Sequence, residues 1–139
     1  MGNRAVIKFK NSDAGIYLHW NGRRDSVEAF LDYCMLRGFR DGNYGVARMA
    51  QIIGNYFGGD LSIGVISTEN CPFADLNPGD NGVYVVENWQ IVERYPLNIT
   101  EQDDYDRLTM LLDINHAQPE KDRISDCQIH SFVAEHRTH

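Results

Sequence analysis

Residues 25–38 carry the signature that most constrains the fold, because they predict a helix with one apolar face. Apolar residues recur there at helical spacing: Val27, Phe30, Leu31, Cys34 and Met35. Asp25 followed by Glu28 is typical of a helix N-terminus, and Gly38 is typical of a helix end. A second helical pattern begins after the turn at 41–43 and ends at Gly58. We therefore expect a pair of helices inserted between strands.

Five β-rich runs surround this helix pair. The predicted strands are 4–10, 15–20, 61–65, 83–87 and 90–95. Turn-forming residues join the first two runs, and Asn88 with Trp89 joins the last two, so each pair predicts a hairpin. A loop over 67–82 separates the third run from the fourth. Because short turns connect neighbouring strands, we expect the α+β class, with an antiparallel sheet of about five strands and helices on one face.

The last part of the chain predicts one more helix and a polar tail. Thr100 with Asp103 resembles a capping box, and the helix that follows ends before Pro119. We expect this C-terminal helix to complete a single α+β domain over 1–118. The remaining residues, 119–139, predict a polar C-terminal tail, mobile or docked on a partner, with a short helix as one option. The weak helical stripe in that tail consists of Ile129, Phe132 and Val133.

Net charge limits the partners of the protein. The 139 residues include 13 Lys and Arg against 20 Asp and Glu, a net charge of −7, which argues against binding nucleic acid over the whole surface. Most of the basic residues lie in the first half of the chain: Arg4, Lys8, Lys10, Arg23, Arg24, Arg37, Arg40 and Arg48. They can build a local anion-binding face, although scattered surface charge is the alternative.

The spacing of the cysteines and the lengths of the apolar runs indicate the cellular compartment of the protein. Three cysteines at wide spacing and an N-terminus without a signal-peptide core lead us to expect a cytoplasmic protein, in the host cell if it is viral. No apolar stretch approaches the length of a membrane-spanning helix, so we expect no membrane partner.

The residues with catalytic or metal-binding chemistry do not form a recognisable motif. Cys127, His130, His136 and His139 are zinc-ligand types, but no Cys-x-x-Cys pair supports them, and we expect no metal. His19 is a candidate general base, but no nucleophile has a signature beside it. The glycine-bearing turns match neither a phosphate-binding loop nor a calcium loop. We therefore expect a protein that is not an enzyme and has no cofactor.

Aromatic and arginine side chains gather near the predicted loops. Trp20 precedes Arg23 and Arg24 at the turn into the first helix. Flat rings stack on nucleobases and guanidinium groups hold phosphates, so this mixture favours a nucleotide-like ligand. The alternative is that these aromatic residues form core or dimer contacts.

Several segments together resemble a known family of small phage proteins. These segments are NRAVIKFK (3–10), GIYLHWNG (15–22), RDSVEAFLDYC (24–34), NYFGGDLSIGV (55–65), GDNGVYVVENWQIV (79–92) and QDDYDRLTMLL (102–112). They make residues 3–118 similar to the Thoeris anti-defence family, whose members sequester cyclic ADP-ribose isomers and related cyclic nucleotides made as immune signals. The resemblance implies binding without cleavage, in dimers or higher homo-oligomers with ligand pockets at subunit boundaries.

The same resemblance implies site residues. Trp20 would stack on the ligand, Arg23 or Arg24 would bind one phosphate, and Arg107 would bind the second. Two rival functions stay open. One is an acidic interaction protein that inhibits a nucleic-acid-binding host effector, since residues 61–126 hold thirteen acidic and four basic side chains. The other is a hydrolase of the same nucleotides, with His19 as its base.

Overall fold

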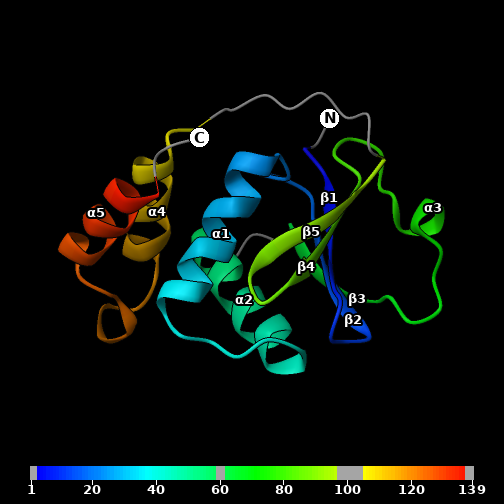
Figure 1. The fold of residues 1–139 in the computed structure, drawn as a ribbon, viewed down its shortest axis with the longest axis horizontal. Helices are drawn as coiled ribbons and strands as arrows, with labels where there is room; N and C mark the ends of the chain where they lie inside the picture. Colours follow the sequence, from blue (N-terminus) through cyan, green and yellow to red (C-terminus); the bar gives the residue numbers. More distant parts are fainter. Residues whose placement is uncertain (1–2, 59–61, 97–104, 137–139) are drawn as a thin grey trace.

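The computed structural model describes residues 3–58, 62–96 and 105–136. Its centre is a five-stranded sheet with the strand order β3-β2-β1-β4-β5. The strands are β1 (Ala5–Phe9), β2 (Ala14–Leu18), β3 (Ile63–Ser67), β4 (Val83–Glu87) and β5 (Gln90–Tyr95). Figure 1 shows the sheet between a layer of helices and the single turn of α3. The α+β class is confirmed.

Two predicted hairpins are present, and one strand is displaced. β1 pairs antiparallel with β2, and β4 pairs antiparallel with β5. Asn88 and Trp89 both have positive φ, as a type I′ two-residue hairpin turn requires. β3 covers Ile63–Ser67 instead of the predicted 61–65. Its antiparallel pairing with β2 places Ile63 opposite Leu18 and Ser67 opposite Ala14, so each of its residues pairs with one residue of β2.

The expectation of an antiparallel sheet is wrong for the central strand pair. β1 and β4 run parallel, with Val6 opposite Val83 and Phe9 opposite Val86, so the sheet is mixed. Short turns determine the directions of the two hairpins, but they leave the relation between the hairpins open. The long connection from β3 to β4 has room to cross the sheet and bring β4 alongside β1 in the same direction.

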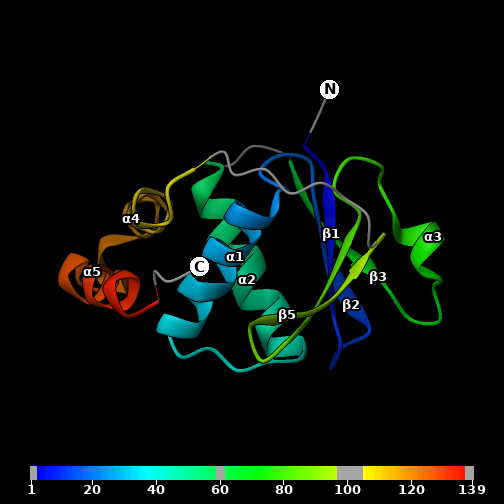
Figure 2. The same ribbon diagram turned by 45° about the horizontal axis from the view of Figure 1, so that its top comes forward.

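Four helices lie on one side of the sheet. They are α1 (Arg24–Leu36), α2 (Asn43–Tyr56), α4 (Arg107–Ala117) and α5 (Asp126–Glu135). α1 and α2 cover the sheet, while α4 and α5 form an outer layer (Figures 1 and 2). Alternate residues of β1 and β4 pack into this main core, including Phe9 and Tyr84, which are fully buried. The predicted helix pair between strands is confirmed.

The opposite face of the sheet carries the short helix α3 (Phe73–Leu76), which the sequence pattern did not predict. Leu76 packs there with Val6 and Val83 in a second, smaller apolar cluster. Helices therefore occupy both faces of the sheet, which corrects the one-face expectation. Four residues make a single helical turn, too short for a periodic pattern to stand out in a loop.

The ends of the helices differ in part from their predicted caps. α1 begins after Arg23, so Asp25 lies inside the first turn, where its carboxylate accepts hydrogen bonds from the N–H groups of Ser26 and Tyr105, each at 2.7 Å. The predicted capping pair Thr100 and Asp103 lies outside the described residues. α4 begins after Asp106, whose carboxylate accepts from the Thr109 N–H at 3.1 Å.

The predicted tail contributes to the core. A 3₁₀ turn (Glu120–Asp122) leads into α5, where Ile129 is fully buried and Phe132 is 8% exposed. The buried Asn115 of α4 fixes the connection, because its amide donates to the Ile124 carbonyl at 2.8 Å and its oxygen accepts from the Ile124 N–H at 3.1 Å. Residues 126–135 are thus packed against α4 as a helix.

Candidate functional site: a charged pocket beside helix α1

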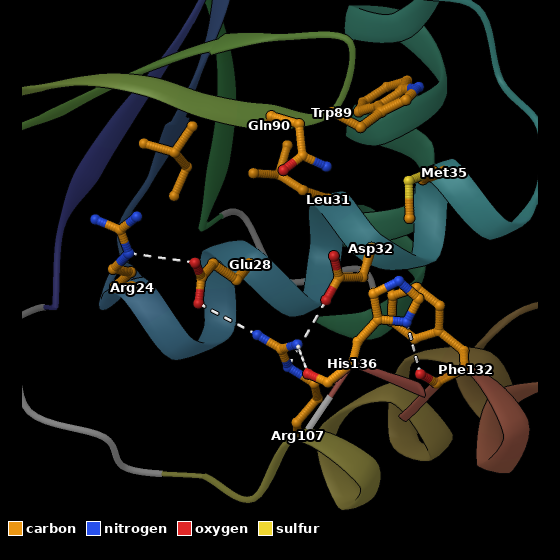
Figure 3. Close-up of a pocket in the computed structure, with 11 residues that line it drawn as sticks. Arg24, Glu28, Leu31, Asp32, Met35, Trp89, Gln90, Arg107, Phe132 and His136 are labelled. Carbon is orange, nitrogen blue, oxygen red and sulfur yellow. Dashed lines mark hydrogen bonds and ion pairs between the residues drawn. The ribbon is translucent and has the colours of Figure 1, made fainter. Parts of the chain in front are cut away.

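A pocket of about 340 Å³ lies between α1, the β4–β5 hairpin and the outer helices α4 and α5. Figure 3 shows the side chains that surround it. Its lining residues are Arg24, Glu28, Leu31, Asp32, Met35, Trp89, Gln90, Ile91, Arg107, Phe132 and His136. The volume lies at the lower end of the range for small-molecule sites.

Helix α1 supplies one wall of the pocket. Arg24, Glu28, Leu31, Asp32 and Met35 follow one another at spacings of three or four residues, so they share one face of the helix. Leu31, 1% exposed, is the apolar member of this set, and Arg24, Glu28 and Asp32 are the charged members.

Four charged side chains form a continuous network across this wall. Glu28 contacts two arginines through different carboxylate oxygens: Oε2 lies 3.2 Å from Arg24 Nε, and Oε1 lies 3.4 Å from Arg107 Nη2. Asp32 Oδ2 lies 3.8 Å from Arg107 Nε, an ion-pair distance longer than a hydrogen bond. The guanidinium groups of Arg24, on α1, and Arg107, on α4, therefore both contact the Glu28 carboxylate.

Helix α5 closes the pocket on the far side. The ring of His136 stacks on Phe132, with centroids 4.2 Å apart, and its Nδ1 donates to the Phe132 carbonyl at 2.8 Å. The His136 carbonyl accepts from Arg107 Nη1 at 3.4 Å. Arg107 of α4 is therefore held between α1 and the end of α5.

Trp89 forms the aromatic part of the wall. Its Nε1 donates to the Phe39 carbonyl at 2.9 Å, and its ring meets Phe9 edge-on with centroids 5.8 Å apart. With only 6% of its surface exposed, Trp89 offers a fixed, partly covered surface. It can contribute van der Waals contact with a ligand rather than a free stacking platform.

The structure brings two of the four predicted ligand-binding residues together. Arg24 and Arg107 lie on either side of Glu28, 83 positions apart in the sequence. Trp20 does not line the pocket; it follows β2, is 41% exposed, and meets His19 edge-on at 4.8 Å. Arg23 is the residue before α1 and also does not line the pocket.

The residues that sequence reasoning missed are mostly carboxylates and members of the predicted tail. Glu28 and Asp32 share the helical face of Arg24, and that spacing was the signal available for them. Phe132 and His136 left no such signal, because their positions depend on how α5 packs. Trp89, expected only as part of a hairpin turn, is the tryptophan that lines the pocket.

The other chemical candidates lie away from this pocket. His19 Nδ1 is 3.0 Å from the Tyr17 hydroxyl on the β2 strand. Of the zinc-ligand types in the C-terminal segment, Cys127 and His130 are exposed on α5, while His139 lies outside the described residues. Over residues 3–58, 62–96 and 105–136, no three His, Cys, Asp or Glu side chains are close enough together to hold a metal ion.

Comparisons with known proteins give no further assignment. Searches against protein families, curated proteins and solved structures find no match to the chain. None of the helices in the described ranges combines the length and apolar composition that crossing a bilayer requires.

Proposed function

We propose that this protein binds and sequesters a small nucleotide of the cyclic ADP-ribose type in the pocket beside α1, as a phage-type anti-defence protein would. The observation that carries the proposal is the placement of Arg24 and Arg107 on opposite sides of Glu28. Guanidinium groups hold phosphate oxygens through paired, charge-assisted hydrogen bonds. Two of them facing one pocket suit a ligand with two phosphates.

The carboxylates narrow the class of ligand. Glu28 and Asp32 balance the two arginines, so the pocket does not favour a bare inorganic anion. A nucleotide offers both kinds of group, because its phosphates accept hydrogen bonds from arginine and its ribose hydroxyls donate to carboxylates. Its flat base can make van der Waals contact with apolar side chains that line the pocket, Leu31 and Trp89 among them.

The resting ion pairs do not stand in the way of a phosphate. Each arginine meets Glu28 through one oxygen only, and the Arg24 and Glu28 side chains are 40% and 34% exposed. The exposed ion pair between Arg24 and Glu28 contributes about 0–1 kcal/mol because water screens it. A charge-assisted bond to a phosphate contributes about 1.5–3 kcal/mol, so exchange of partner at Arg24 favours the bound ligand.

The hydrolase alternative, with His19 as its base, is not centred on this pocket. His19 directly follows β2 and does not line the pocket. The His136 ring is held by its own helix through the bond to the Phe132 carbonyl.

We further propose that the protein acts as a homo-oligomer. A volume of about 340 Å³ is small for a ligand with two phosphates and a base, so a second subunit would have to complete the enclosure. Exposed aromatic residues suit such a contact: Trp20 precedes α1 and is 41% exposed, and Tyr105, bound to Asp25 through its N–H, is 47% exposed.

Calorimetry with a panel of cyclic ADP-ribose isomers tests the proposal. We expect the Arg24→Gln variant to bind at least about tenfold more weakly than the unchanged protein, because it loses a charge-assisted bond. Arg107→Gln should weaken binding as well. Arg40→Gln is the matched control, since Arg40 is exposed and lies outside the pocket, and its affinity should stay unchanged. Equal affinity for all variants would refute the site, and no binding to any isomer would refute the proposal and favour the acidic-partner alternative.

Recovery of the ligand tests the absence of catalysis. The protein is saturated with the isomer that it binds and is then denatured by heat. Mass spectrometry gives the mass of the released compound. An intact compound supports sequestration, whereas a hydrolysed compound contradicts it. Native mass spectrometry of the same sample gives the number of subunits, and a monomer that binds ligand would overturn the oligomer proposal.

A further inference from the structure

A second pocket, of about 400 Å³, lies on a different part of the molecule, between the end of α1, the middle of α2 and the turn after α4. Four of its residues, Arg48, Gln51, Ile52 and Asn55, share one face of α2. The others are Arg37, Phe39, Gln118 and Asp122. No residue lines both this pocket and the pocket beside α1.

One wall of this second pocket is rigid and polar. Gln118 is 2% exposed, and its amide nitrogen donates to the carbonyls of Ile52, at 3.1 Å, and Ile114, at 2.9 Å. Its side-chain oxygen accepts from Asn55 Nδ2 at 2.8 Å. These bonds fix the separation of α2 from the end of α4, so the pocket is a built feature of the packing.

The charges in this pocket are not balanced as they are beside α1. Arg37 and Arg48 face one acidic residue, Asp122, and neither arginine forms an ion pair with a carboxylate among residues 3–58, 62–96 and 105–136. The excess positive charge favours an anion.

The Arg37 side chain is hydrogen-bonded to Tyr33, but one of its guanidinium nitrogens lacks an acceptor in the described part of the chain. Its guanidinium lies over the rings of Phe39, at 5.0 Å, and Tyr33, at 5.8 Å, which hold it in place. Burial raises the pKa of Tyr33, and the neighbouring Arg37 opposes that rise. Even so, Nη1 of Arg37 is buried and has no hydrogen-bond partner in the described part of the chain. Leaving a charged donor buried without an acceptor is costly, and a bound oxyanion would supply the acceptor after a small movement of the side chain.

We propose that this pocket binds a small metabolite through an oxyanion, either a phosphate or a carboxylate, held between Arg37 and Arg48. The guanidinium fork of Arg37 supplies the donors, and it lies over the ring of Phe39. Arg48 is exposed on α2 and supplies the second positive charge from the open side. This site is separate from the nucleotide site proposed above and does not depend on it.

NMR of the arginine Nε–Hε groups tests the site, with inorganic phosphate and succinate as the two probes. We expect saturable shifts at Arg37 and Arg48 and none at Arg40. The Arg48→Gln variant should bind the probe about tenfold more weakly, because it loses a charge-assisted bond. Arg40→Gln should bind it as the unchanged protein does, because Arg40 is exposed and lines neither pocket.

The comparison of probes assigns the ligand class. A stronger response to phosphate supports a phosphorylated metabolite, and a stronger response to succinate supports a carboxylic acid. The proposal is overturned if neither probe shifts Arg37 or Arg48 in a saturable way, or if Arg48→Gln binds as tightly as the unchanged protein. Arg48 is exposed, so its variant should keep the melting temperature and leave the binding result interpretable.

Discussion

Gly22 lies where the start of the α1 segment crosses the beginning of β1, and the backbone there leaves no space for a side chain. Its N–H donates to the Asn3 carbonyl at 2.8 Å, and its own carbonyl accepts from the buried Tyr84 hydroxyl at 2.7 Å. A Cβ at this position would clash with the Asn3 carbonyl oxygen and come within 2.9 Å of Ala5 Cβ. The close approach positions the segment that leads to Arg24.

A matched pair of glycine substitutions tests this crowding. Gly22→Ala should lower the free energy of unfolding by about 1–3 kcal/mol, the usual cost of forcing extra atoms into a packed site. Gly54→Ala should raise it by about 0.5–1 kcal/mol, because Gly54 lies inside α2 and its added Cβ meets no atom within 4 Å. Urea unfolding measures both values. Equal shifts in the two variants would contradict the predicted difference in space.

At the scale of elements, the carboxylate of Asp41 ties three loops together at one end of the sheet. Asp41 lies in the connection between α1 and α2, and its Oδ2 accepts from Asn11 Nδ2 at 2.8 Å and from the Asn88 N–H at 3.0 Å. Asn11 follows β1 and Asn88 is in the β4–β5 turn. The contact therefore joins the helix pair to both hairpins.

This contact should make stability depend on pH. Burial by itself would raise the pKa of Asp41, but hydrogen bonds from the Asn88 N–H, the Asn11 side chain and the Gly42 N–H outweigh it and hold the pKa below the ordinary value of 3.8. A carboxyl group with a lowered pKa in the folded state stabilises the protein above 3.8, and that contribution is lost as pH falls through the folded-state pKa.

The Asp41→Asn variant measures that contribution. We expect it to lower the free energy of unfolding at neutral pH by about 1 kcal/mol, since hydrogen bonds to a charged group are replaced by neutral ones. Its stability should also fall less steeply than that of the unchanged protein as the solution is acidified below 3.8. Chemical unfolding followed by circular dichroism at a series of pH values gives both results. Parallel pH profiles for the two proteins would disprove the assignment to Asp41.

Local patterns account for most of the elements but not for their arrangement. The β4–β5 hairpin has the predicted bounds, because alternation and a two-residue turn are both local signals. The parallel pairing of β1 with β4 depends on where a long connection crosses the sheet, and no neighbouring residues encode that choice. The start of α1 was predicted at Asp25, but Asp25 lies inside the first turn of the helix. Asp and Glu are favourable there as well, because they interact with the positive end of the helix dipole.

The residues of the candidate site also divide into those that a sequence pattern predicts and those that depend on how the elements pack. The positions of Arg24 and Arg107 came from a family resemblance, and the structure places both in one pocket. Their neutralising partners Glu28 and Asp32 follow from the helical spacing on α1. The sequence did not predict that Phe132 and His136 line the pocket. A weak apolar stripe in a polar segment does not show which surface the segment packs against.

At the scale of the whole molecule, α5 is part of the cooperative unit. Its Ile129 and Phe132 belong to the same core cluster as the helices α1 and α4. Asn115 of α4 is 1% exposed and makes its hydrogen bonds to Ile124 and to the Tyr33 hydroxyl, the latter at 2.6 Å. Removing the segment after Gln118 would expose apolar surface and leave the polar groups of Asn115 short of partners.

Truncation after Gln118 tests this integration. Each of Ile129 and Phe132 contributes about 1.5–3 kcal/mol when buried, so the truncated chain should lose about 3–6 kcal/mol of unfolding free energy. It should also bind a dye that detects exposed apolar surface. His130→Ala is the control, because His130 is exposed on the same helix and its change should stay within about 0.5 kcal/mol. A truncated chain as stable as the complete one would show that residues 1–118 fold as a domain without α5.

The parallel alignment of β1 with β4 governs the order in which the chain can assemble during synthesis. β1 is made before the other strands of the sheet, yet one of its edges stays unsatisfied until residues 83–87 have also been made. During that interval β1 presents open backbone groups and apolar side chains that other nascent chains could capture. Translation speed and chaperone supply should consequently influence the yield of correctly assembled protein more than they would for a chain whose strands all pair with their immediate successors.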